Sequence, residues 1–156
     1  MSGVRSGARS VLKYFAPLYV VLIVIQVFLV GEGLFRMKAI TADECDKAHL
    51  NCLSNSRTLD AHRFFGFILT EPLALLFLFA ALLAWFPDTR VRTITILAPI
   101  VTFLQVIWAV IGSWAGGLHP IGAFVALGMF GWLTRVLRQG QPETADAGAP
   151  AAAPAG

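Results

Sequence analysis

Apolar residues gather in four long stretches that polar segments separate. Each stretch is about 20 residues long, which at about 1.5 Å per residue covers the roughly 30 Å hydrocarbon core of a bilayer. Lipid offers no hydrogen-bond partners to a backbone, so each stretch is expected to be a helix. The pattern predicts an all-α fold, an integral membrane four-helix up-down bundle over residues 1–138, with helices at about residues 14–31, 62–86, 93–114 and 120–137.

Composition and charge agree with a membrane protein and predict its orientation. Of 156 residues, 57% are hydrophobic and only 13% are charged, with a mean hydropathy of +0.73. Basic residues cluster on one side of the four-pass chain, which the positive-inside rule makes cytoplasmic. Both termini are therefore expected in the cytoplasm, with the protein in the bacterial inner membrane. This topology also accounts for the net charge of +3, so no nucleic-acid partner is expected. The basic clusters are Arg5, Arg9 and Lys13, then Arg90 and Arg92, then Arg135 and Arg138.

Two segments outside the helices have distinct compositions. Residues 139–156 are mostly Ala, Pro and Gly and cannot bury apolar side chains, which predicts a disordered tail. The outer loop, residues 32–61, contains both cysteines of the chain, Cys45 and Cys52. Thiols outside the cytoplasm are usually oxidised, so a disulfide between them is favoured. A metal site formed by both thiolates and His49 is the alternative.

Two of the three histidines lie at equivalent places in the predicted topology. His62 opens the second helix and His119 opens the fourth, both near the outer interface. On a helical wheel Gly66 lies one turn below His62, and Gly122 lies close beside the face of His119. Small residues there leave room for a flat macrocycle, so the pattern predicts bis-histidine ligation of a b-type haem, haem b. The alternative is that each histidine only caps a helix end or is solvated there.

Residues beside the histidines have roles consistent with such a site. Arg63 falls at headgroup level, where it could pair with a haem propionate. Asp60 or a backbone carbonyl could accept the free ring N–H of an imidazole and so select its tautomer.

The same elements resemble one four-helix half of heme A synthase. The resemblance spans about residues 14–137 and rests on the two loop cysteines, on the His62-Arg63 pair and on His119 at the start of the fourth helix. The chain is also similar to small uncharacterised four-helix bacterial membrane proteins with Asp-x-His-Arg and Leu-His-Pro elements. In heme A synthase such histidine pairs hold haem, so the resemblance implies haem binding here.

Three departures limit what the resemblance implies. The family's glutamate three residues before the first histidine is Leu59 in this chain, with Asp60 next to it. The Trp-Pro element that accompanies the loop cysteine is absent, and the chain has one half where the synthase has two. One histidine pair cannot both hold a resident haem and oxidise a second one. Heme A synthesis is therefore not predicted.

An ionisable residue inside the second helix also needs a role, because charges in a membrane are costly. Glu71 falls at about the depth of Gln105 on the third helix and slightly below Gln26 on the first. A buried polar cluster of these three residues is predicted, with Thr102 one turn below Gln105. Glu71 lies on the opposite side of its helix from His62. It is either a hydrogen-bonded carboxylic acid between helices or a proton-relay or transport site.

These observations predict a function without assigning an enzyme activity. The favoured function is haem binding for electron transfer, or as an accessory to a respiratory or haem-handling membrane complex. The alternatives are a cofactor-free structural or assembly subunit and a small transporter that works through Glu71. Expected partners are the lipid bilayer and such a complex, or a second copy of the chain. The sequence contains no Walker-type loop, HExxH helix or nucleophile elbow, which favours a non-enzymatic role.

Overall fold

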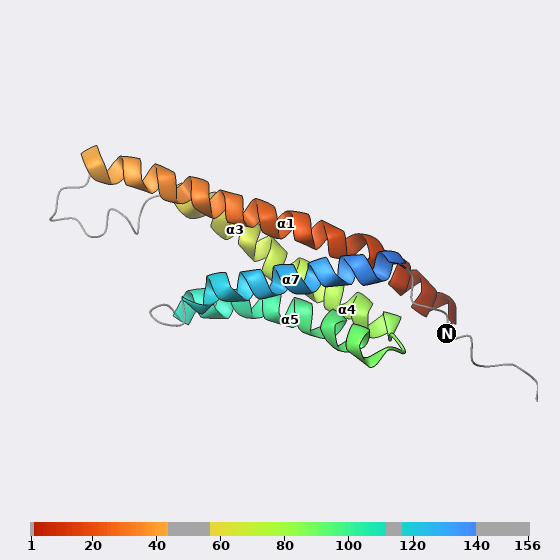
Figure 1. The fold of residues 1–156 in the computed structure, drawn as a ribbon. Helices are drawn as coiled ribbons and strands as arrows, with labels where there is room; N and C mark the ends of the chain where they lie inside the picture. Colours follow the sequence, from red (N-terminus) through yellow and green to blue (C-terminus); the bar gives the residue numbers. More distant parts are fainter. Residues whose placement is uncertain (1, 44–56, 112–116, 140–156) are drawn as a thin grey trace, which may run out of the picture.

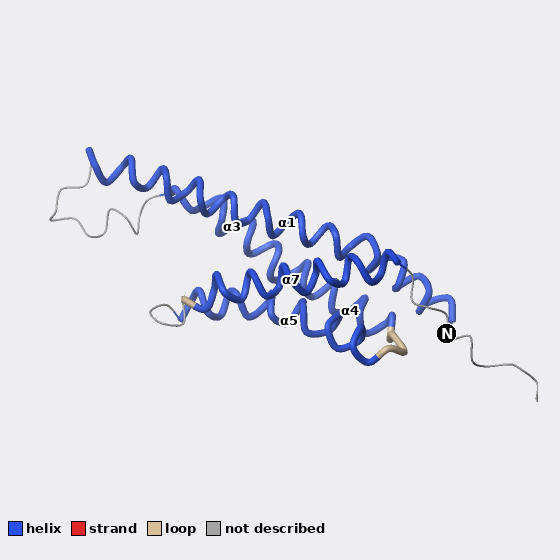
Figure 2. Tube along the Cα trace, viewed as in Figure 1, coloured by secondary structure: helices blue, strands red, loops and turns tan. Residues whose placement is uncertain are grey.

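The described part of the computed structural model, residues 2–43, 57–111 and 117–139, is helical apart from short turns (Figures 1 and 2). The prediction of an all-α fold is thus confirmed for these residues. The elements are α1 (Ser2–Asp43), the short 3₁₀ helix η1 (Arg57–Leu59), α3 (Asp60–Ile68), the π-helical turn η2 (Leu69–Leu73), α4 (Ala74–Ala84), α5 (Thr89–Ile111) and α7 (Leu118–Gln139).

Within the described residues, four helical segments are long and apolar enough to cross a membrane, as in a multi-pass membrane protein. They are Gly3–Arg36, Arg57–Ala84, Thr89–Ile111 and Leu118–Gln139. Large apolar side chains are exposed on every one of them, including Phe28, Phe79, Val110 and Phe124. In water so much exposed apolar surface would be unfavourable, whereas in a bilayer it faces lipid chains.

The first helix is much longer than its apolar stretch. The sequence predicts a helix at about residues 14–31, but α1 runs from Ser2 to Asp43. Hydropathy identifies only the turns that lie in hydrocarbon, and polar turns on either side can continue the same backbone hydrogen bonds. Near its far end α1 passes close to η1, because Gly33 has no side chain. A Cβ atom there would lie 2.6 Å from Leu59 and 2.7 Å from the Thr58 carbonyl oxygen.

The helices pack around a core of aromatic side chains. α1 contacts both α4 and α7, and α5 contacts the same two helices. In the centre the ring of Tyr19 stacks on Phe130, with centroids 4.3 Å apart and planes 11° apart. Phe77 meets Phe130 edge-on at 5.1 Å. Such pairs stabilise a core beyond the area they bury, so Tyr19, Phe77 and Phe130 hold α1, α4 and α7 together.

The second span changes its helical repeat at Pro72. Proline lacks a backbone N–H, and the turn around it, η2, is π-helical. Two hydroxyl groups supply donors to this stretch. Tyr19 Oη donates to the Leu69 carbonyl at 2.9 Å and Thr70 Oγ1 donates to the Gly66 carbonyl at 2.8 Å. The Tyr19 bond is buried and links α1 to the irregular turn.

One end of the molecule is braced by an arginine. α4 ends at Ala84, and the next residue, Trp85, has a left-handed φ of 35°. The Arg9 guanidinium donates to the carbonyls of Ala84 and Trp85, both at 3.1 Å, and lies over the ring of Phe86. It thereby supplies donors to carbonyls that a helix end leaves without partners. Figure 1 shows the start of α1, the α4–α5 connection and the end of α7 at this end.

Changing Tyr19 to Phe should destabilise the protein. The ring and its packing remain, but the Leu69 carbonyl loses its hydroxyl donor in a buried place. The expected loss is about 1–3 kcal/mol in the free energy of unfolding, measured by denaturant titration in detergent. Tyr14→Phe is the matched control, because Tyr14 is 72% exposed on the same helix. Equal effects of the two substitutions would contradict the assigned role of the Tyr19 bond.

Candidate functional site

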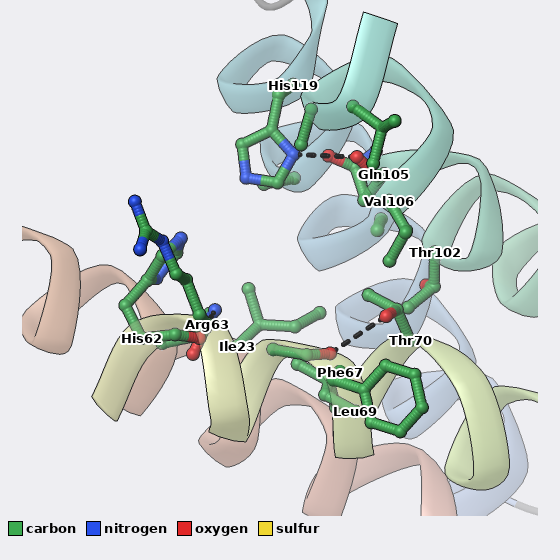
Figure 3. Close-up of a pocket in the computed structure, with 16 residues that line it drawn as sticks. Ile23, His62, Arg63, Phe67, Leu69, Thr70, Thr102, Gln105, Val106 and His119 are labelled. Carbon is green, nitrogen blue, oxygen red and sulfur yellow. Dashed lines mark hydrogen bonds between the residues drawn. The ribbon is translucent and has the colours of Figure 1, made fainter. Parts of the chain in front are cut away.

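A cavity of about 400 Å³ lies among α1, α3, α5 and α7 (Figure 3). Its size falls within the range of cofactor and small-molecule sites. Most of its wall is apolar, with Ile23, Phe67, Val106 and Ala126 among the residues there. A small set of polar side chains also lines it: Gln26, His62, Arg63, Thr70, Thr102, Gln105 and His119.

The two histidines face each other across the mouth of this cavity. His62 is in the first turn of α3 and His119 in the first turn of α7. Their ring centroids are 6.2 Å apart and their planes are 89° apart. Imidazole nitrogens bind metal ions at about 2 Å, so two rings on opposite sides of one ion have centres about 6 Å apart. Both planes need only contain the nitrogen–metal–nitrogen axis, so perpendicular rings are compatible with this arrangement.

The backbone of α5 determines the tautomer of His119. Its Nδ1 lies 3.0 Å from the Gln105 carbonyl oxygen. A carbonyl only accepts, so Nδ1 carries the proton and Nε2 keeps a free lone pair. A metal-binding histidine is usually oriented in this way. In His62 the buried Nδ1 has no hydrogen-bond partner.

A glutamine accompanies each histidine. Gln26 Nε2 donates to the His62 carbonyl at 2.9 Å, and Gln105 Nε2 donates to the Val101 carbonyl at 3.2 Å. In both glutamines the buried Oε1 atom has no donor. Together with His62 Nδ1, three buried polar atoms without partners belong to residues that line this one cavity. Such atoms are costly unless a ligand or water completes them.

The glycines beside the histidines make room for these glutamines. A Cβ atom on Gly66 would collide with the Gln26 amide, and one on Gly122 would collide with the Gln105 amide and with Trp108. From the sequence we expect the two glycines to leave space for a macrocycle. In the structure the space beside Gly66 holds the Gln26 carboxamide, and the space beside Gly122 holds the Gln105 carboxamide together with the Trp108 ring. The two carboxamides are the flexible ends of long side chains.

Arg63 lines the mouth of the cavity and is exposed. Its guanidinium lies 3.8 Å from the Asp60 carboxylate, and both side chains are more than half exposed. Such a pair contributes little to stability, so the arginine can readily exchange this partner for another anion. Asp60, a candidate for orienting an imidazole, is thus paired with Arg63, and the backbone carbonyl option applies to His119.

The predicted polar cluster is divided by the structure. Gln26, Gln105 and Thr102 line the histidine cavity, whereas half-buried Glu71 is in η2 and does not line it. The helical wheel also puts Glu71 on the opposite side of its helix from His62. The depths estimated from the sequence group the two glutamines with Glu71, whereas the structure places them beside the histidines.

The predicted disulfide and its metal-site alternative cannot be compared with the structure. Cys45, Cys52 and His49 lie outside the described residues. Across residues 2–43, 57–111 and 117–139 no group of three or more His, Cys, Asp or Glu side chains is placed to hold a metal ion. A haem would take only two ligands from the protein, so the pair His62 and His119 would be enough to hold one.

No protein-family description, curated protein or solved structure matches this chain. The resemblance to heme A synthase therefore rests on the residues quoted for it. The features that bear on function are the cavity itself, its two imidazoles and its polar atoms that lack partners.

Changing Gly122 to Ala should lower stability although alanine is the better helix former. The new methyl group would displace the Gln105 amide and Trp108, with an expected loss of about 1–3 kcal/mol in the free energy of unfolding. Gly128→Ala on the same helix is the control, because no atom lies within 4 Å of its Cβ position. That change should be neutral or stabilise by up to about 1 kcal/mol. Both are measured by denaturant titration in detergent, and a stabilised Gly122→Ala protein would refute the close packing described here.

Proposed function

We propose that His62 and His119 bind one b-type haem between the helices of an up-down bundle in the bacterial cytoplasmic membrane. The observation that carries the proposal is the histidine pair itself. The ring centres are 6.2 Å apart, and the two imidazoles line the same cavity. The lone pair of His119 Nε2 is free, because Nδ1 donates to a backbone carbonyl.

The other lining residues fit the same group. The apolar wall suits the hydrophobic edge of a porphyrin, and Arg63 at the mouth offers a cation for a propionate. The Gln105 carbonyl orients His119 from behind. The carboxamides of Gln26 and Gln105 are flexible and can yield to an occupant, whereas backbone in the same place could not.

The donor set favours electron transfer over catalysis. A haem with two histidine ligands would supply one-electron oxidation and reduction. His62 and His119 would both hold the iron, and the apolar wall around them would keep a substrate away from it. This is the role expected of an electron-transfer protein, or of an accessory to a respiratory or haem-handling complex.

The orientation of the chain belongs to the same proposal. The end of the molecule braced by Arg9 also carries the other basic clusters, which the positive-inside rule assigns to the cytoplasm. Both termini are then cytoplasmic, and the histidines lie near the outer face. A redox partner would reach the site from the outer face or through the bilayer.

A cofactor-free structural or assembly subunit is the second candidate. It is favoured by one observation, the placement of glutamine amides in the spaces beside Gly66 and Gly122, since these contacts alone would join helices. The transporter candidate has less support, because Glu71 does not line the histidine cavity.

The protein purified in detergent from a haem-replete host should be red. On reduction with dithionite it should show a sharp α-band, because two imidazoles make the iron low-spin. His62→Ala and His119→Ala should each abolish that band, which is measured by visible absorption. His49→Ala is the control, because His49 is the remaining histidine and is not part of the proposed site.

Two results would argue against this proposal. A colourless wild-type protein from a haem-replete host favours the structural subunit. A spectrum that survives both histidine substitutions would mean that other residues hold the haem.

Removing the charge of Arg63 at the mouth of the cavity should weaken haem binding but not abolish it. Arg63→Gln loses a charge-assisted bond to a propionate at a solvent-exposed place, so about a five- to tenfold increase in the haem dissociation constant is expected. Haem titration of apoprotein measures it. Arg57→Gln, a nearby exposed arginine that does not line the cavity, should leave the constant unchanged. Equal effects of the two changes would indicate general surface charge instead of a propionate contact.

A further inference from the structure

A second cavity lies at the other end of the molecule, where α1 begins. It has a volume of about 520 Å³ and is lined by three cations from successive turns of α1, Arg5, Arg9 and Lys13. Side chains four residues apart share a helix face. The cations therefore form one stripe along the cavity wall.

The middle cation of this stripe already has partners. Arg9 donates to two carbonyls at the end of α4 and lies over Phe86. Arg5 and Lys13 are exposed, and no carboxylate in the described part of the chain pairs with either. Arg9 is thus held in place at the middle of the stripe. The charges of Arg5 and Lys13, one helical turn to either side, are uncompensated.

The remaining wall has two different chemical characters. Ser6 and Ser10 place hydroxyl groups on the same side as the cations. Phe86 and Leu137 form the apolar part of the wall, although only small parts of these side chains are accessible, 2% and 9%. Lys13 immediately precedes the apolar stretch of α1, so the cations fall at the level of lipid headgroups. A ligand that suits this wall carries an anionic group next to an apolar chain.

We propose that this cavity binds the phosphate group of an anionic phospholipid. Arg5 and Lys13 provide the charges that attract the phosphate, and the serine hydroxyls provide further donors. The first part of an acyl chain packs against Phe86 and Leu137. Basic pockets between membrane helices bind acidic lipids in this manner.

The topology of the chain alone does not explain this arrangement. The positive-inside rule requires basic residues on one side of the membrane, but it requires no cavity among them. Arg135 and Arg138 also lie near the end of α7 and are exposed, yet neither lines the cavity. Non-specific attraction to an anionic surface would involve Arg135 and Arg138 as much as Arg5 and Lys13, whereas a built site depends on Arg5 and Lys13.

The test is a titration of purified protein in neutral detergent with short-chain phosphatidylglycerol, following the melting temperature Tm. Phosphatidylcholine of the same chain length and sodium phosphate are titrated in parallel. A ligand that binds the folded state raises Tm as its concentration rises. The double variant Arg5→Gln/Lys13→Gln removes the two unpaired cations. Arg135→Gln/Arg138→Gln removes the same charge outside the cavity and is the matched control.

We expect phosphatidylglycerol to raise the Tm of the wild type, and phosphatidylcholine and phosphate to have little effect. The α1 variant loses two charge-assisted contacts to the lipid phosphate, so it should need at least tenfold more phosphatidylglycerol for the same shift. The control variant should behave as wild type. An equal loss in both variants would overturn the proposal in favour of surface charge. Stabilisation by phosphate alone would overturn the assignment to a lipid.

The readout needs no haem, so it is independent of the histidine site. A colourless protein that still responds to phosphatidylglycerol through Arg5 and Lys13 would retain this inference and lose only the proposed function. Arg9→Gln separately tests the hydrogen bonds from Arg9 to the Ala84 and Trp85 carbonyls. It should lower Tm without any lipid, because the α4 carbonyls lose their donors.

Discussion

The structure depends on one constraint: backbone carbonyl and N–H groups within a membrane must find partners inside the protein. A regular helix satisfies its own backbone groups, so additional partners are needed only where a helix is irregular or ends. At Pro72 the second span becomes π-helical, and the Tyr19 hydroxyl reaches across from α1 to the Leu69 carbonyl. At the end of α4, the Arg9 guanidinium donates hydrogen bonds to the carbonyls of Ala84 and Trp85. Two polar side chains of α1, Tyr19 and Arg9, thus bond to carbonyls where the second span departs from a regular helix. These bonds orient the first span against the second.

The sequence predicts the helices better than their ends. Four apolar runs suffice to identify four spans, because hydropathy reports which residues lie in hydrocarbon. It does not report where a helix stops, and α1 extends from Ser2 to Asp43 through polar turns on both sides. The pairing of His62 with His119 follows from their equal depth in the predicted topology. The partners of Gln26 and Gln105 could not be predicted, because depth alone does not determine how a helix is rotated about its axis.

The histidine cavity has an approximate internal repetition. On one side Gln26 of α1 lies against Gly66 and bonds to the backbone of His62; on the other, Gln105 of α5 lies against Gly122 and its backbone orients His119. Each unit thus combines a histidine, a glycine nearby in the same helix and a glutamine from a neighbouring helix. The bonds within the two units differ, since a side-chain amide donates in one and a backbone carbonyl accepts in the other.

The polar atoms of this cavity bear on the choice between a structural subunit and a cofactor protein. A helix contact needs no imidazole, and leucine or methionine in place of the glutamines would fill the same spaces without leaving two amide oxygens unbonded. Each buried unbonded atom costs about 1–3 kcal/mol, a large share of the 5–15 kcal/mol that stabilises a typical protein. Water at the mouth can offset part of that cost. Water does not explain why two imidazoles face each other 6.2 Å apart, with the tautomer of one already selected. A ligand shared between them would explain it.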